Sequence, residues 1–296
     1  MTTESTPLPS PLLSLPDAVA GAGVDAPVAA HYGSFIVEQR TLEAGEGFVD
    51  LSHRGVVRVS GPDRLTWLHS LTSQHLDALP PGVPTGTLVL SPQGHVEHAM
   101  FGTDDGEAFT AHVEPGEAPA LVDWLDRMRF MMRVEVADVT DELAAAAGPA
   151  CGLWAFEALR IARGEPRLGL DTDHRTIPNE AGWIGPAVHL DKGCYRGQET
   201  VARVHTLGRP PRRLTLLHLD GSVNRLPAVG TPLEVDGRQV GFVGTSARHH
   251  ELGPIALAMV KRNVGLDVVL DVDGIPAAQE VVVDPEVGLH VRPQLR

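Results

Sequence analysis

Apolar residues in the first half of the chain follow strand and helix periods in turn. VVRVS at 56–60 alternates β-branched residues and is followed by Gly61-Pro62, which predicts a strand and a turn. Leucines at 65, 68, 71 and 76 then recur near helical spacing behind Asp63, a candidate N-cap. The stretch 86–102 predicts a hairpin that turns at 92–94. Further strands are predicted at 108–114 and 133–140, and helices at 118–130 and 153–164.

The second half of the chain changes its pattern twice. Residues 164–185 contain few apolar side chains, and irregular segments of this length inside compact domains tend to be functional. A helix is predicted to begin near Gly197. From Leu214 onward, short strands recur at regular spacing and are twice joined by Asp-Gly, which predicts a small β-barrel or sandwich.

These elements divide the chain into four regions of an α+β protein. Residues 1–30 are rich in Pro, Ala and small polar residues, so we expect a flexible arm with one short helix near 16–20. Residues 31–140 are expected to form an N-terminal α+β region, and residues 141–213 a central segment interleaved with it. After Pro210-Pro211, residues 214–296 are expected to form the C-terminal β-barrel.

Composition narrows the class of protein. The chain has 296 residues, of which 43% are apolar and 21% charged, as in soluble globular proteins. A net charge of −14 disfavours nucleic acid as a primary partner, and no apolar run approaches the ~20 residues needed to cross a membrane. The first Lys or Arg is Arg40, so the basic start of a signal peptide is absent. Two cysteines cannot build a disulfide framework, which favours a reducing, cytoplasmic location.

The stretch KGCYRGQETVARVH at 192–205 contains one of the two lysines and one of the two cysteines of the chain. In an extended segment Lys192, Cys194 and Arg196 would share a face, and the following helix N-terminus would add positive potential. Both effects favour a thiolate. Cys194 and Lys192 are therefore the candidate catalytic residues. Free cysteine also often packs in a core, and the local sequence leaves that alternative open.

Charge and loop position suggest an anionic or heterocyclic ligand. Residues 192–213 contain six basic side chains and one acidic one, a local charge of +5 that would attract folate with its glutamate tail, or a phosphate. A solvated basic face is the alternative. Glu180 lies on a constrained loop, where a carboxylate can accept the two parallel N–H bonds that a pterin ring presents. A capping or surface role is the alternative for Glu180.

KGCYRGQETVAR resembles the signature of the YgfZ-type folate-binding proteins, relatives of the glycine-cleavage T-protein. The resemblance runs from about Val49 to the C-terminus and includes LRIARGEPRLGLDTDHRTIPNEA and GRPPRRL. It implies a three-domain fold around a central channel that binds tetrahydrofolate or a derivative, with 141–213 as the folate-binding segment. It makes Glu180 the expected pterin contact and places Cys194 and Lys192 beside the channel. We further expect folate contacts from Glu97, Tyr195, Arg196, Gln198 and Arg203.

One departure from the T-protein pattern bears on activity. Where those relatives carry two adjacent aspartates after a Gly turn, this chain has Glu97-His98. A carboxylate near the folate amine would assist methylene transfer, but Glu97 has a longer side chain than aspartate and would not reach the same point. Classical aminomethyltransferase activity is therefore not expected. The expected function is a tetrahydrofolate-binding protein that supports the assembly or repair of iron–sulfur client proteins. The alternatives are a folate-dependent one-carbon (aminomethyl) transferase and a non-catalytic interaction module.

The histidines do not predict a metal site. Adjacent side chains in a strand point apart, so His249 and His250 are not expected to share a metal ion. Two cysteines are too few for an iron–sulfur cluster of the chain's own, which usually needs four ligands.

Overall fold

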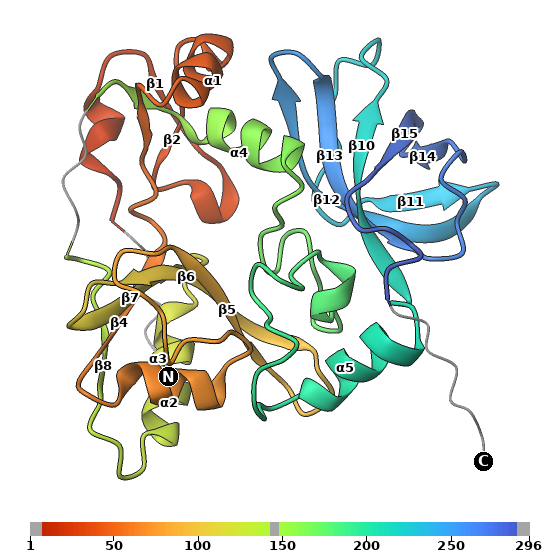
Figure 1. Ribbon diagram of the computed structural model, residues 1–296. Helices are drawn as coiled ribbons and strands as arrows, with labels where there is room; N and C mark the ends of the chain where they lie inside the picture. The colour runs from red at the N-terminus through yellow and green to blue at the C-terminus, as the bar shows by residue number, and fades with distance from the viewer. Residues whose placement is uncertain (1–7, 143–147, 289–296) are drawn as a thin grey trace, which may run out of the picture.

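The computed structural model describes residues 8–142 and 148–288 (Figure 1). The N-terminal part, drawn red to yellow in Figure 1, combines helices with a β-sheet, and the C-terminal part, drawn cyan to blue, is a barrel. Helix α4 (Leu153–Ala162) lies between them. In these described residues, no helix combines the length and the hydropathy that crossing a membrane requires.

A five-stranded antiparallel sheet supports the N-terminal part. Helices α2 (Arg64–Leu71) and α3 (Ala118–Met128) bury Leu68 and Leu125 against it. The predicted hairpin, strands and helices are confirmed here, because each is encoded by a local apolar period. The sheet order is β5 (Thr85–Leu90), β6 (Val96–Asp104), β7 (Ala108–Val113), β4 (Gly55–Ser60) and β8 (Glu135–Asp138).

Residues 8–30 are ordered, so the expected flexible arm is wrong for this part of the chain. Strand β1 (Ala18–Ala20) pairs with β2 (Ala29–Tyr32), and it replaces the short helix expected near 16–20. Two short 3₁₀ turns, η1 (Pro11–Ser14) and η2 (Gly23–Asp25), flank β1, and Ala29 and Ala30 are buried. Residues 1–7 of the predicted arm lie outside the described residues.

Helix α4 connects the two parts of the molecule. Its first turn follows the short parallel pair of β3 (Phe48–Val49) and β9 (Ala150–Cys151), and helix α1 (Phe35–Glu43) packs beside it. Towards its C-terminal end, Ala158 and Ile161 are buried in a cluster with barrel residues. Gly164 has φ of 71° and ends the helix as predicted, because glycine adopts this left-handed conformation without strain.

The central segment packs on the β5–β6 hairpin. Residues 164–185 are largely irregular, with the 3₁₀ turn η3 (Pro178–Glu180), and helix α5 (Gln198–Leu207) begins next to Gly197 as expected. Trp183, Tyr195 and Val201 are buried in one cluster with Leu88 and Leu90 of β5.

A closed six-stranded barrel follows Pro210-Pro211. Its interior buries Leu217, Val243 and Val260. The α+β class and the C-terminal barrel are therefore confirmed. The strands around the barrel are β10 (Arg212–Leu219), β13 (Gly253–Lys261), β12 (Arg238–His249), β11 (Pro232–Val235), β14 (Leu270–Val272) and β15 (Ile275–Val281).

Candidate functional site

A cavity of about 630 Å³ lies where three parts of the chain meet. Residues 21–25 form one wall, the first turns of α4 form another, and the barrel contributes residues 226–229 and the end of β12. Its volume is within the range of cavities that bind small molecules. The cavity is the strongest candidate for a binding site among the described residues.

Aromatic side chains cluster around Trp154 in the lining of this cavity. Trp154 lines it and is 52% exposed, although large aromatic residues are usually buried. The ring of His31 lies 4.9 Å from the Trp154 ring, and that of Phe35 lies 6.5 Å from it. Arg248 adds a half-buried guanidinium to the lining, with Nη2 donating to Asn224 at 2.7 Å. A flat ring could stack here while an anionic group reaches Arg248.

Arg167 binds two other charged residues of the lining, Asp25 and Glu157. The Arg167 guanidinium is 2% exposed and donates to both oxygens of Asp25 at 2.9 Å. It also donates to Glu114 on the β7–α3 connection at 2.8 and 3.0 Å and to Glu157 at 3.3 Å. His53 binds the same Asp25 carboxylate at 2.8 Å. One arginine thus joins the N-terminal segment, the region of the sheet and α4.

The network continues into the barrel through Asp171. Its carboxylate accepts hydrogen bonds from Arg160 at 2.9 Å and from the backbone N–H and hydroxyl of Thr245 at 2.6 and 2.7 Å. Arg160 also pairs with Glu157. A Cβ atom on Gly244 would lie 2.2 Å from Asp171 Oδ1, so only glycine permits this approach.

Arg167 and His53 keep the Asp25 carboxylate ionised. Burial would raise the pKa of Asp25, but hydrogen bonds from His53 and Arg167, with the charge of Arg167, hold that pKa far below its usual range. Such a carboxylate accepts hydrogen bonds well, but it is a weak proton acceptor near neutral pH.

Arg54, next to this network, has unused hydrogen-bond donors. It is 6% exposed, and its Nε and Nη2 are buried without a hydrogen-bond partner in the described part of the chain. Glu114 approaches Nη2 only to 3.5 Å, and Nη1 lies 3.4 Å from His112 Nδ1. Burial, with the charge of Arg54, lowers the pKa of His112 to about 4. Buried donors without partners are costly, and an acceptor oxygen from a ligand would satisfy them.

The predicted catalytic pair does not share a face. Lys192 is 4% exposed, and its ammonium group donates to the carbonyls of His69 and Thr72 at the end of α2. It also lies 4.9 Å from the centre of the buried Tyr195 ring. Cys194 is exposed between these two buried side chains. The segment is irregular rather than extended, which is why the expected alternation fails.

The other predicted folate contacts near α5 form pairs within the chain. Arg196 binds Glu97 at 2.9 Å, and Arg203 binds Glu199 at 2.9 Å on the exposed side of α5. Gln198 donates to the backbone carbonyl of Lys192 at 3.2 Å. None of these residues is among those that line the cavity. Their folate contacts stay predictions.

Glu180 is deeply buried, and its carboxylate binds Arg212. It is 1% exposed and accepts two hydrogen bonds from Arg212, at 2.9 and 2.8 Å, and one from the N–H of Ile177 at 3.2 Å. Arg212 also binds Asp173. A carboxylate that accepts two parallel N–H bonds was expected here, and Arg212 supplies them. Whether a pterin takes its place stays a prediction.

Carboxylates also offset the local positive charge of residues 192–213. Arg196, Arg203, Arg209 and Arg212 are each in an ion pair, and Lys192 is bound by carbonyls. The basic stretch is therefore much less available to an external anion than its charge of +5 suggests.

Sequence reasoning missed Asp25, Trp154 and Arg167. Asp25 lies in the predicted arm, and 142 positions separate it from Arg167, so no local spacing could connect the two. The one useful signal was the long irregular segment 164–185, which contains Arg167 and Asp171.

No family model matches the chain, but its sequence is similar to those of several proteins named as transferases. An Arabidopsis thaliana protein, named only provisionally as a chloroplastic transferase, is 26% identical over 70% of this chain and 64% of its own length. An aminomethyltransferase of Streptomyces avermitilis is 32% identical over 69% of this chain and 51% of its own length. One from Synechococcus elongatus is 28% identical over 80% and 59%. The chain spans about half to two thirds of the length of these relatives.

A solved structure agrees in fold. The glycine cleavage system aminomethyltransferase T of Bartonella henselae superposes with a TM-score of 0.72, covering 90% of this chain and 93% of that chain at 17% identity. The predicted T-protein-like architecture is thereby confirmed at the level of fold. The chain is similar in sequence to aminomethyltransferases and has the fold of an aminomethyltransferase T.

Proposed function

We propose that this chain binds a reduced folate in the cavity between residues 21–25, α4 and the barrel. The observation that carries the proposal is the cavity itself, whose lining combines the exposed aromatic Trp154 with the buried charges of Glu157 and Arg167. The resemblance of KGCYRGQETVAR to folate-binding proteins and the aminomethyltransferase fold support tetrahydrofolate or a derivative as the ligand.

The chemistry of folate matches the lining group by group. A pterin is a flat heteroaromatic ring, and the exposed Trp154 offers a surface for stacking. The ring N–H and exocyclic amine need acceptors, and Asp25 Oδ2 and Glu157 Oε2, which each accept one hydrogen bond from an arginine, have a further lone pair for them. Arg248 suits the carboxylates of the glutamate tail.

The same geometry favours binding over aminomethyl transfer. A general base works best with a pKa near the operating pH, but Arg167 and His53 hold the pKa of Asp25 far below that. Glu97, the residue expected to replace the T-protein aspartates, pairs with Arg196 and does not line the cavity. A folate-dependent aminomethyl transferase therefore remains the second candidate, supported by the names of the relatives.

We further propose that this chain supports the assembly or repair of iron–sulfur proteins. Cys194 is exposed, while Lys192 and Tyr195 on either side of it are buried and fix the loop that presents the thiol. An exposed thiol on a fixed loop could contact an iron–sulfur client protein in the cytoplasm, the proposed location. Cys194→Ala should leave the fold and folate affinity nearly unchanged and remove this support. A fall in the unfolding temperature of the variant would assign the thiol to packing instead.

Calorimetric titration with 5-formyltetrahydrofolate tests the binding site. Trp154→Ala should weaken binding by about 5- to 150-fold, because stacking on an aromatic side chain contributes about 1–3 kcal/mol. Phe130→Ala is the matched control, since Phe130 is 92% exposed and does not line the cavity. If Trp154→Ala binds like the wild type while Glu180→Gln loses affinity, the ligand lies at η3 instead. Absence of binding to the wild type would refute the proposal and favour an interaction module.

A further inference from the structure

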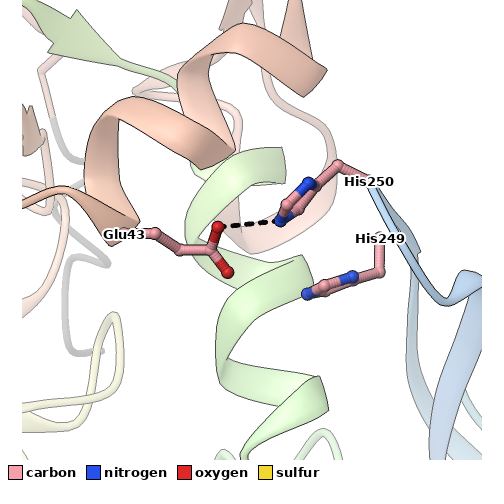
Figure 2. Close-up of side chains that lie close together, drawn as sticks. All are labelled: Glu43, His249 and His250. Atoms are coloured by element: carbon pink, nitrogen blue, oxygen red, sulfur yellow. Dashed lines mark ion pairs between the residues drawn. The ribbon is translucent and has the colours of Figure 1, made fainter.

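We propose that Glu43, His249 and His250 form a site for a divalent transition-metal ion such as Zn²⁺, which would bridge α1 and the barrel. Glu43 is the last residue of α1, His249 is the last residue of β12, and His250 follows in the turn before β13. Figure 2 shows the three side chains converging from these two parts of the chain. One nitrogen or oxygen atom of each lies within 4.8 Å of those of the other two.

The expectation that His249 and His250 point apart is wrong. That expectation holds inside a strand, but the chain leaves β12 at His249 and turns. The two rings stack instead, with centroids 4.7 Å apart and planes 29° from parallel. Both rings point toward Glu43 (Figure 2).

The ligand types and access suit such an ion. Two imidazoles and one carboxylate are a common protein ligand set for zinc that keeps a fourth position open. The Glu43 side chain is 44% exposed, so a cation can enter and keep a water molecule. Bonds of about 2.0–2.2 Å in a tetrahedron put ligand atoms roughly 3.3–3.6 Å apart, so Glu43 Oε2 and His250 Nε2, now 2.8 Å apart, separate slightly on binding.

The surroundings of His250 support the metal site independently. The fully buried Gln39 donates to the carbonyl of Arg248 and accepts from the N–H of His250, both at 2.9 Å. These bonds fix the turn against α1. The His250 side chain is only 4% exposed, and neither of its ring nitrogens forms a hydrogen bond with the described residues. Its Nε2 lies 2.8 Å from Glu43 Oε2, the position that a bridging cation would take over.

His249 must change its tautomer and lose two hydrogen bonds before it can bind a metal ion. Its Nδ1 accepts from the N–H groups of Glu251 and Leu252, each at 3.2 Å, which leaves the proton of the neutral ring on Nε2. A metal at Nε2 moves that proton to Nδ1, so the turn must release both of these long bonds. We therefore expect the ion to bind with slower or weaker uptake than at a preformed site.

Titration with Co²⁺ tests the site directly, because its visible absorption reports ligand number and geometry. Wild-type protein, first dialysed against a chelator, should give a tetrahedral spectrum that Zn²⁺ abolishes by competition. Glu43→Gln, His249→Ala and His250→Ala should each weaken Co²⁺ binding by more than about tenfold, since even partners outside the coordination sphere contribute 10–100-fold.

His75→Ala is the matched control. His69, His75 and Asp77 also lie within 4.8 Å of one another, but His75 and Asp77 are both exposed. Co²⁺ binding that survives in the three site variants and disappears in His75→Ala would overturn the proposal, as would an octahedral, hydrated spectrum in the wild type. A second readout is folding stability: Zn²⁺ should raise the unfolding temperature of the wild type but not of Glu43→Gln, whose exposed side chain is not needed for packing.

Discussion

Lys192 contributes to structure at a position where the sequence suggested chemistry. Its ammonium group donates to the carbonyls of His69 and Thr72, which are among the carbonyls left without helical partners at the end of α2. Burial lowers the pKa of Lys192 to about 8. The neighbouring Cys194 thus receives a fixed position, while the cation faces away from it into the interior.

The lowered pKa of Lys192 predicts a rise of stability with pH. The unfolded chain holds this proton up to about pH 10.5, whereas the folded chain releases it near 8, so between these values the unfolded state binds more protons. The free energy of unfolding should therefore increase from pH 8 to 10.5, by about 1–3 kcal/mol relative to Lys192→Met. Urea unfolding at several pH values measures this difference. Parallel curves for the two proteins would mean that Lys192 titrates normally.

At the scale of elements, the contact between the central loop and the barrel depends on one glycine. Asp171 binds Thr245 through two hydrogen bonds, and the chain at Gly244 leaves no room for a side chain. The same contact closes one wall of the cavity, which Thr245 lines together with Leu170. A local clash here would therefore affect both stability and ligand binding.

Gly244→Ala should lower the free energy of unfolding by about 1–3 kcal/mol, the typical cost of forcing atoms into a packed interior. It should also weaken folate binding, because Asp171 must move away from Thr245. Gly193→Ala serves as the control, since no atom lies within 4 Å of its added Cβ. Chemical denaturation measures the free energy of unfolding of both variants, and calorimetry measures their folate affinity. Equal stability of the two variants would show that β12 can shift to accommodate the added methyl group, which would contradict this prediction.

Elements with a local period could be predicted from the sequence, and elements held by distant partners could not. The hairpin of β5 and β6, the helix α4 with Gly164, and the barrel all carry their own pattern. Strands β1 and β2 do not: these short segments are stabilised by Asp25 and its partner Arg167, 142 positions away. The motif around Cys194 is contiguous and could be predicted from the sequence, whereas the cavity is lined by segments far apart in the chain and could not.

At the scale of the whole molecule, a buried ion-pair network joins the N-terminal segment, α4 and the central segment, and hydrogen bonds of Asp171 extend it to Thr245 of the barrel. Arginines at 54, 160 and 167 face carboxylates at 25, 114, 157 and 171. Buried pairs of this kind add little over apolar packing, but loss of one partner leaves an uncompensated charge. The network thus fixes the geometry of the cavity more than it adds stability.

Arg167→Met should destabilise the fold by about 3–5 kcal/mol at neutral pH, because Asp25 and Glu114 would remain buried without it. The folded pKa of Asp25 lies far below its usual 3.8, so its stabilisation is present above that value and is lost as the pH falls below it. The wild type should therefore lose more stability than the variant on acidification. Acid titrations followed by circular dichroism compare the two, and identical acid transitions would contradict this role of Arg167.

The most direct test of the central claim is a crystal structure of this chain with 5-formyltetrahydrofolate. We predict density for the pterin inside the cavity, with its ring against Trp154, its N–H edge toward Asp25 or Glu157, and the glutamate tail toward Arg248. Density for the ligand beside Glu180 and Arg212, with the cavity unchanged, would contradict the account and return the pterin to the position that the sequence resemblance implied.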